Sequence, residues 1–411
     1  MSDDKQFDLL LYGATGFTGK LIAEYLDKHP ELEGRSWAIA GRNDKKLEVL
    51  QKSLSRQGPQ RVVCDLDDVA AVDAMVRSAR VVISTAGPYS THNGESLLGA
   101  CARAGVHYSD LSGEGFWQRE MIDAFHDEAV SSGAKIVLGG GVDSIPSDLG
   151  AYLALQALDF GADEPVEARI TGKYTEYSGS FSGGTIASGK ARQAALRSGR
   201  LSKEAMDDPY ILAPGAQSRA DEEPTQDGMP AGFLRKVEAG YGVLLPFFMA
   251  KINAPIVRRS LALQGLDGHV SYRECCSLGM WSRISWLYFS RGFGVPLGQP
   301  INFVPKSGEG PPKWLLKQGA FSVEVTAEAS DGRLAKAVVA GKGDPGYGAT
   351  SKMLGELALC LLLDEQVSPD IAGVLTPATA LGDALVDRLN DACDGDFMQL
   401  YSSAERASTH Q

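Results

Sequence analysis

Three glycines near the start of the chain, three residues apart, constrain the fold more than any other feature of the sequence. Gly13, Gly16 and Gly19 follow the apolar run 9–11 and open a stretch, up to Leu26, in which apolar residues recur at helical spacing. This order of signals is typical of a buried parallel strand, a tight turn and a helix. Glycines at such a turn bind the pyrophosphate of a dinucleotide, so the sequence predicts a dinucleotide-binding unit here.

Each glycine has a separate task in such a unit. Gly13 lets the chain turn away from the strand, Gly16 lets the backbone approach a phosphate, and Gly19 lets the helix pack close to the sheet. The start of the helix adds unpaired N–H groups and the positive end of the helix dipole. We therefore expect the motif to contact the cofactor through Gly13, Thr15, Gly16, Phe17, Thr18 and Gly19.

A basic residue follows the second expected strand, residues 36–40. Many NAD-binding units carry an acid at this place, where it binds the ribose 2′-hydroxyl, but here the residue is Arg42. A guanidinium pairs well with a 2′-phosphate because its N–H donors match the phosphate oxygens. The sequence therefore favours NADP(H) over NAD, with nearby Asp44 as the competing acid.

Strand and helix signals alternate through residues 1–150, which predicts an α/β fold with a Rossmann doubly wound parallel sheet that binds NADP. Ligands of such sheets bind in the loops that follow the strands. We expect Asp65 to reach the adenine amino group, and the loop of Ala86, Gly87 and Pro88 to pass the nicotinamide ribose. Four polar side chains on such loops are candidates for catalysis: Tyr89, Glu114, Asp143 and Ser144.

The pattern changes in residues 151–348, where strand signals such as 166–177 and 320–329 occur without regular helices between them. This pattern predicts a second, α+β domain with a mixed or antiparallel sheet that holds the substrate. Residues 349–411 are expected to form C-terminal helices that pack back on the first domain, the last of them capped by Thr376.

Charge and cysteine content argue against several classes of function. The 411 residues carry a formal net charge of -12, which argues against a nucleic-acid partner. None of the six cysteines belongs to a CxxC pair and no metal-ligand spacing occurs, so we expect no metal site. The amino terminus lacks an apolar signal core, so we expect a cytoplasmic protein. The apolar segment 281–297 is expected to be partly buried, with a peripheral contact at the inner membrane face as the alternative.

Several motifs together resemble the saccharopine dehydrogenase-like oxidoreductases: Gly-Ala-Thr-Gly-Phe-Thr-Gly, Ala-Gly-Arg, Gly-Pro-Tyr and Asp-Ser-Ile-Pro-Ser-Asp. The segments 181–188, 256–260, 343–347 and 373–378 narrow the resemblance to the mycobacterial-type trans-acting enoyl reductases. The resemblance implies an NADP(H)-binding domain and a second α/β domain. It also implies reduction of an enoyl intermediate made by a polyketide or lipid synthase.

Three functions fit these observations. The first is an NADPH-dependent oxidoreductase that reduces an enoyl C=C bond of a lipid or polyketide intermediate. The second is a saccharopine-type C–N oxidoreductase, and the third is a non-catalytic NADP-binding sensor or scaffold at a lipid surface. The mechanism of the short-chain dehydrogenases is disfavoured, because no tyrosine of the chain has a lysine four positions later.

Two adjacent arginines, Arg258 and Arg259, are candidates for binding the substrate. As an anion-binding edge beside an apolar groove, they would hold the phosphate of a lipid or of an acyl carrier. The alternative is a solvated pair on the surface. The sequence leaves open whether the chain forms a homodimer.

Overall fold

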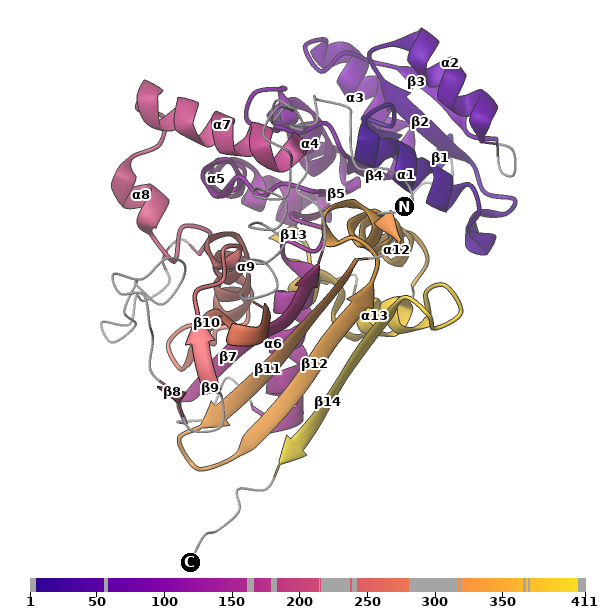
Figure 1. Ribbon diagram of the computed structural model, residues 1–411. Helices are drawn as coiled ribbons and strands as arrows, with labels where there is room; N and C mark the ends of the chain where they lie inside the picture. The colour runs from indigo at the N-terminus through magenta and orange to yellow at the C-terminus, as the bar shows by residue number, and fades with distance from the viewer. Residues whose placement is uncertain are drawn as a thin grey trace, which may run out of the picture.

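The computed structural model describes residues 5–54, 58–160, 166–178, 183–213, 215, 237–238, 242–280, 316–317, 319–364, 367–368 and 370–405. Within these residues the chain forms two seven-stranded sheets. The amino-terminal sheet and its helices lie at one end of the molecule and the second sheet lies at the other end (Figure 1).

The first sheet is wholly parallel, with the strand order β13-β6-β5-β4-β1-β2-β3. Its strands are β1 (Phe7–Tyr12), β2 (Trp37–Gly41), β3 (Gln60–Val63), β4 (Ala79–Ser84), β5 (His107–Asp110), β6 (Lys135–Val137) and β13 (Gly373–Leu375). The helices that connect the first six strands are α1 (Phe17–Leu26), α2 (Asp44–Ser53), α3 (Val69–Arg77), α4 (Gly94–Ala104) and α5 (Gly115–Ser132). The order of β1 to β6 is that of a Rossmann doubly wound sheet, which confirms the predicted fold class.

Both faces of the parallel sheet are buried, which explains the continuous apolar run in β1. Leu9 and Leu11 belong to a core that extends to the second sheet. Leu10 and Tyr12 point to the opposite face and belong to a separate core, which includes residues of α3, α4 and α5. The carboxyl ends of the strands, where the candidate site residues lie, are therefore held by packing from both sides.

The second sheet has the strand order β14-β12-β11-β7-β10-β9-β8. Its strands are β7 (Ala168–Ser178), β8 (Val237–Glu238), β9 (Gly242–Leu245), β10 (Val270–Ser277), β11 (Ala320–Ala329), β12 (Leu334–Lys342) and β14 (Met398–Glu405). Strands β7 and β10 run parallel, and the other neighbours run antiparallel. This is the mixed sheet predicted for the second half of the chain.

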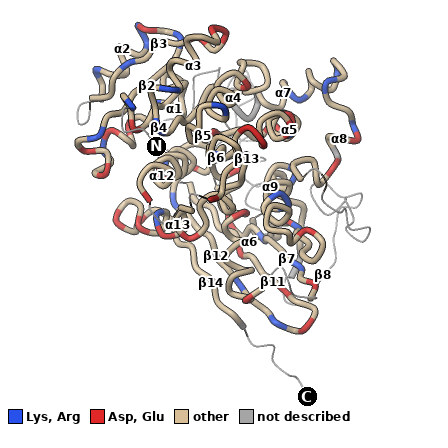
Figure 2. Tube along the Cα trace, turned by 180° about the vertical axis from the view of Figure 1, so that it is seen from behind, with Lys and Arg blue, Asp and Glu red and all other residues tan. Residues whose placement is uncertain are grey.

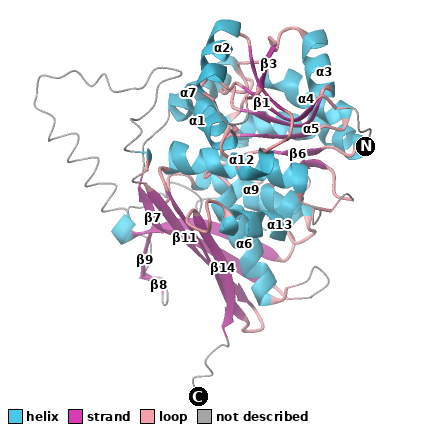
Figure 3. Ribbon diagram, turned by 90° about the vertical axis from the view of Figure 1, so that its right-hand side faces the viewer, coloured by secondary structure: helices cyan, strands magenta, loops and turns pink. Residues whose placement is uncertain are grey.

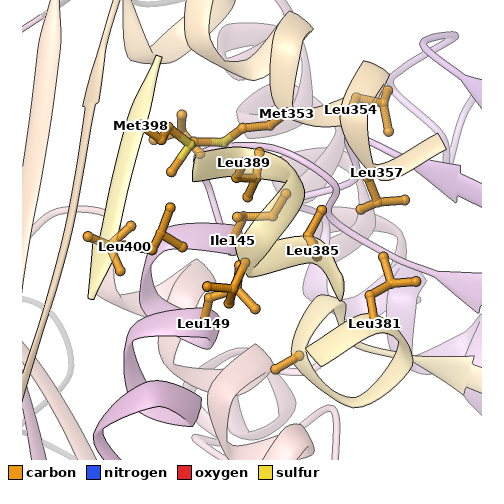
Figure 4. Packing of buried hydrophobic residues seen from close by; sticks show 14 of the residues in the cluster. Ile145, Leu149, Met353, Leu354, Leu357, Leu381, Leu385, Leu389, Met398 and Leu400 are labelled. Carbon is orange, nitrogen blue, oxygen red and sulfur yellow. The ribbon is translucent and has the colours of Figure 1, made fainter. Parts of the chain in front are cut away.

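Helices lie between the two sheets (Figure 3), among them α6 (Ile145–Leu158), α12 (Thr350–Leu363) and α13 (Pro377–Asp391). Helix α6 packs on β11 and β12, whereas α12 packs on α1, β4 and β5. Figure 4 shows how Ile145 of α6, Leu389 of α13 and Met398 of β14 lie together in this layer. One core therefore continues from the parallel sheet through the helices to the second sheet.

The C-terminal segment 349–411 contains the two expected helices, and Thr376 caps α13 by accepting a hydrogen bond from the backbone N–H of Thr379. Helix α12 packs on α1, β4 and β5. The prediction of helices alone was incomplete, because this segment also supplies β13 to the first sheet and β14 to the second. The two sheets are thus joined by the end of the chain as well as by the layer of helices.

The remaining long helices are α7 (Gly183–Ser198) and α9 (Ala250–Leu263), with the short α8 (Lys203–Asp207) between them. In the part of the chain that the structure describes, no helix combines the length and the apolar character needed to cross a bilayer. The segment 281–297, predicted to be partly buried or to contact a membrane, lies outside the described residues. Figure 2 shows basic and acidic positions interspersed along the described elements.

Candidate nucleotide and substrate site

The turn after β1 is packed too closely for side chains. Gly13 has a φ of +78°, and a Cβ there would lie 2.9 Å from the Thr85 hydroxyl and 3.0 Å from the backbone nitrogen of Ala86. A Cβ on Gly19 would overlap the carbonyl oxygen of Gly13 and lie 2.8 Å from the Cα of Ala14. The turn and the close approach of α1 to β1 thus require glycine at both positions.

At the start of α1, no side chain of the cap accepts a hydrogen bond from the first backbone N–H groups of the helix. Gly16 is the N-cap residue, its position offers no side-chain cap, and the first turn carries no acidic residue. Thr15 and Thr18 are partly buried beside this end, as is Phe17. The N–H groups of the first turn and the helix dipole therefore suit a bound phosphate.

Arg42 is exposed directly after β2, at the carboxyl edge of the sheet. The competing acid, Asp44, accepts a hydrogen bond of 3.0 Å from Arg61 of β3. Asn43 between them caps α2 by accepting from the backbone N–H of Lys46. Asp44 is therefore already paired with a cation within the protein, whereas Arg42 is exposed and makes no ion pair with a described residue.

The loop after β4 lies beside the glycine turn. The Thr85 hydroxyl donates to the carbonyl oxygen of Gly13 over 3.1 Å, which places Ala86, Gly87 and Pro88 next to the expected phosphate site. Thr85 was not among the predicted site residues, because a threonine at the end of a strand gives no distinctive sequence signal. Asp65 is exposed after β3, where it accepts a hydrogen bond from its neighbour Asp67.

Tyr89 and Glu114 join two loops of the site. The Tyr89 hydroxyl donates to the carbonyl oxygen of Ser84 over 2.9 Å and accepts from the backbone N–H of Leu111 over 3.0 Å. The buried Glu114 carboxylate accepts from the backbone N–H of Tyr89 and from the Ser90 hydroxyl. The polar groups of both predicted residues are thus engaged within the protein, where they fix the loops after β4 and β5 to each other.

The glycine-rich loop before α6 carries the other two predicted residues. Ser144 is buried and donates to the carbonyl oxygen of Gly139, so its hydroxyl closes this loop. Asp110, at the end of β5, binds the same loop by accepting from the backbone N–H of Gly139. The Thr350 hydroxyl of α12 accepts from the N–H of Val142 over 3.2 Å. The backbone on both sides of Asp143 is therefore held in place.

Asp143 differs from the other predicted residues because its carboxyl group accepts no hydrogen bond from any described residue. Burial raises the pKa of this carboxyl from 3.8 to about 6. A Cβ on Gly113 would lie 3.9 Å from the Oδ2 of Asp143 and 3.5 Å from Ile252 of α9, so Asp143 and Ile252 both lie beside the loop after β5. A partly buried carboxyl with a pKa near neutrality can hold and release a proton in a reaction.

The structure corrects the expected position of Arg258 and Arg259. They lie inside α9 with only 4% and 5% of their surface exposed. Arg258 donates to the carbonyl oxygens of Tyr272 and Pro209, and Arg259 donates to those of Leu212 and Val374. Burial lowers the pKa of Arg259 to about 10. The pair therefore joins α9 to its neighbours and forms no exposed anion-binding edge.

A wall of aromatic side chains, which was not predicted, is formed by β7 and by the segment between β9 and α9. Tyr174 of β7 stacks on Phe247 with ring centroids 4.1 Å apart, and Tyr177 contacts Phe247 and Phe248 edge-on at 5.6 and 5.5 Å. Phe247 and Phe248 directly precede α9, whose Ile252 lies beside Gly113 next to Asp143. The charge of Asp143 also contributes to raising the pKa values of both tyrosines. This wall gives the site an apolar side opposite the loops of the parallel sheet.

The sequence is similar to a family model and to several named proteins. Residues 9–137 match the family model described as the saccharopine dehydrogenase NADP binding domain. A protein of Mycobacterium tuberculosis that is provisionally named a trans-acting enoyl reductase is 36% identical over 406 residues, which cover 94% of this chain and 96% of the relative. The trans-acting enoyl reductase of Mycobacterium ulcerans is 33% identical over 415 residues, with 94% and 96% of the two chains covered.

The fold is also found in a solved structure. Apo saccharopine dehydrogenase (L-Glu forming) from Saccharomyces cerevisiae superimposes with a TM-score of 0.51 over 96% of this chain and 99% of its own. Only 14% of the residues are identical, so this similarity concerns the fold. Among the described residues, no three His, Cys, Asp or Glu side chains gather as a metal ion would require.

Proposed function

Because this chain belongs to the saccharopine dehydrogenase-like family of trans-acting enoyl reductases, we propose that it uses NADPH to reduce the C=C bond of an enoyl intermediate of lipid or polyketide type. The family and the NADP-binding domain at residues 9–137 make it an NADP-dependent oxidoreductase. The resemblance that the motifs predicted is thereby confirmed. The substrate remains the proposed part of the function.

The uncapped start of α1 beside the close-packed glycines carries this proposal. The turn leaves no room for a Cβ at Gly13 or Gly19, and the first-turn N–H groups point away from the helix with no side-chain acceptor in the cap. A pyrophosphate fits this cradle, and Arg42 at the end of β2 supports a 2′-phosphate. The residues present therefore fit NADP(H) better than NAD.

When bound, NADPH supplies the hydride that reaches the β-carbon of the enoyl group. The residues of the chain then have to bind the acyl part, exclude water and hold a proton for the α-carbon. We assign to Asp143 the role of donating this proton, because its carboxyl is partly buried and has a pKa of about 6. The loops fixed by Tyr89 and Glu114 hold the backbone around this position.

Three finer features belong to the same proposal. The substrate is an acyl-type molecule, which a carrier presents as a thioester. The protein works in the cytoplasm. Contact with the inner membrane face is the alternative to test if the acyl chain is membrane-bound. A homodimer would be detected by the molecular mass in solution.

The test is NADPH consumption by the purified protein with three substrate classes: trans-2-enoyl N-acetylcysteamine thioesters, imines and ketones. We expect consumption with the enoyl thioesters, and none with the saturated thioester of the same chain length as the matched control. Consumption with imines alone would support the C–N oxidoreductase instead. Tight NADPH binding without turnover of any class would support a sensor or scaffold.

A further inference from the structure

The end of β7 brings a residue of the second sheet to the site. A Cβ on Gly319 would lie 2.6 Å from the carbonyl oxygen of Ser178 and 2.7 Å from the backbone nitrogen of Asp344. The last residues of β7 thus lie against the segment before α12. In the same segment, Tyr347 contacts Phe17 of the glycine motif edge-on at 4.7 Å. The end of β7 is therefore positioned against a segment that touches the nucleotide loop.

A β-bulge determines which way the last tyrosine of β7 points. Tyr174 and Glu176 pair with the consecutive residues Val323 and Ser322 of β11, so Thr175 is an extra residue. In a regular strand, side chains three positions apart face opposite sides of the sheet. The extra residue shifts the alternation by one, which brings Tyr177 to the same side as Tyr174, where both rings contact Phe247.

The hydroxyl of Tyr177 is available to a ligand. Within the described residues it has no hydrogen-bond partner, whereas the hydroxyl of Tyr174 lies 2.9 Å from that of Ser147. Burial, together with the charges of Asp143 and Asp344, raises the pKa of Tyr177 well above 10. Tyr177 therefore keeps its proton at neutral pH, so its hydroxyl can donate a hydrogen bond to the oxygen of a carbonyl group.

We propose that the Tyr177 hydroxyl donates a hydrogen bond to the carbonyl oxygen of the bound acyl substrate, beside Asp143. This inference rests on the proposed reduction of an enoyl group. As the C–H bond forms at the β-carbon, the π electrons of the C=C bond move toward the carbonyl, and negative charge develops on its oxygen. A donor fixed at that oxygen stabilises this charge. The α-carbon then takes the proton of the Asp143 carboxyl, so the C=C bond is reduced and NADPH is oxidised to NADP⁺.

Buried polar contacts behind the aromatic wall hold Tyr177 in this place. The Glu274 carboxylate accepts from the Ser147 hydroxyl over 2.8 Å and from the Asn253 amide over 2.7 Å. Ser147 in turn contacts Tyr174, which stacks on Phe247, the ring that packs against Tyr177. A hydrogen-bond donor held by a rigid second layer needs no reorganisation during the reaction.

The experiment compares Tyr177→Phe with Tyr401→Phe. The first variant removes only the hydroxyl and keeps the ring in the wall. The second removes a hydroxyl from the exposed tyrosine of β14 in the same sheet, at a position with 57% of its surface exposed. We expect Tyr177→Phe to lower kcat for a trans-2-enoyl thioester by about 100-fold or more, the loss typical of one oxyanion donor. KM for the thioester should rise by no more than about 10-fold, whereas the Kd for NADPH should change by less than about threefold, since the hydroxyl binds the acyl substrate and not the cofactor.

A binding measurement separates this inference from the proposed function. The Kd of the saturated octanoyl thioester for the NADP⁺-loaded protein is measured by titration calorimetry with wild type and both variants. We expect Tyr177→Phe to bind this product about 5- to 10-fold more weakly than Tyr401→Phe, as the loss of one neutral hydrogen bond predicts.

Each outcome decides one of the two statements. If Tyr177→Phe reduces the enoyl thioester at a rate within about threefold of the wild-type rate, the role of Tyr177 is overturned and the enoyl reductase function stands. A wild type that binds the octanoyl thioester but reduces no enoyl group would overturn the proposed function, and the loss of affinity in Tyr177→Phe would still support carbonyl binding. Equal affinity of all three proteins for the thioester would overturn carbonyl binding by Tyr177.

Discussion

Replacing Asp143 by asparagine should make the protein more stable at neutral pH and less active. The carboxyl of Asp143 has a pKa of about 6 in the folded chain, against 3.8 when solvated, and burial is the cause. The folded state therefore favours the protonated form. Asparagine resembles that form in size and lack of charge, and no hydrogen bond to a described residue is lost.

The size of the effect follows from linkage. Below the solvated pKa both states are protonated, so the contribution of Asp143 to stability is full there and is lost as the pH rises through the folded pKa of about 6. Above about pH 7, the shift in pKa corresponds to a loss of roughly 3 kcal/mol in the free energy of unfolding. This value is an upper limit because the side chain keeps some contact with water. We expect Asp143→Asn to exceed wild type by about 1–3 kcal/mol near pH 8 and to equal it near about pH 3, below the solvated pKa.

Urea unfolding of both proteins across this pH range measures the difference. Two other buried carboxyls, Asp110 and Asp148, also have pKa values of about 6, but they contribute equally to wild type and variant. Asp127→Asn on the exposed side of α5 is the control, and its stability should stay within about 0.5 kcal/mol of wild type.

The activity of Asp143→Asn should fall by about 100-fold or more, as expected when a proton-donating group is removed. A variant that is less stable than wild type at every pH would show that the carboxylate makes stabilising contacts and would refute the reasoning. A gain in stability that does not depend on pH would refute the assignment of the raised pKa.

Three further predictions concern the cofactor site and the buried arginines. Arg42→Ala should weaken NADPH binding by about 10- to 100-fold and leave NADH binding unchanged, while Arg80→Ala at the amino end of β4 should change neither affinity. Equal affinity of the wild type for both cofactors would argue against a 2′-phosphate site. Gly19→Ala should abolish NADPH binding and lower the Tm because the new Cβ has no room, whereas Gly268→Ala, whose Cβ would meet no described atom within 4 Å, should do neither. Unchanged NADPH affinity in folded Gly19→Ala would show that the turn does not hold the cofactor. Arg259→Ala should lower the free energy of unfolding by about 3 kcal/mol, because buried carbonyl groups lose their donor; unchanged stability with a raised KM for a phosphate-bearing substrate would restore the anion-binding interpretation.

The parallel sheet and its cofactor loop could be predicted because their signals are local. The glycines, the apolar run of β1 and the cap at Thr376 each arise from a few neighbouring residues with a fixed geometric demand. The long strands of the second sheet, such as β11, also show clear alternation over ten residues.

Other features depend on contacts between distant segments. The three residues of β13 are too few for a periodic pattern, and they form a strand only because the edge of β6 is available. Arg258 and Arg259 look like surface residues in the sequence, but carbonyl groups from other elements accept their hydrogen bonds. The bulge in β7 moves Tyr177 to the side of Tyr174 and cannot be inferred from alternation, since an extra residue inverts it.

Transfer of deuterium from NADPH that carries deuterium at both C4 positions tests whether this chain reduces an enoyl C=C bond. The purified protein is incubated with the labelled cofactor and a trans-2-enoyl thioester, and the product is analysed by mass spectrometry and NMR. The account predicts a saturated thioester that carries one deuterium on the β-carbon, together with one NADP⁺ per product. Unchanged enoyl thioester in the presence of bound NADPH, or a saturated thioester without deuterium on the β-carbon, would contradict it.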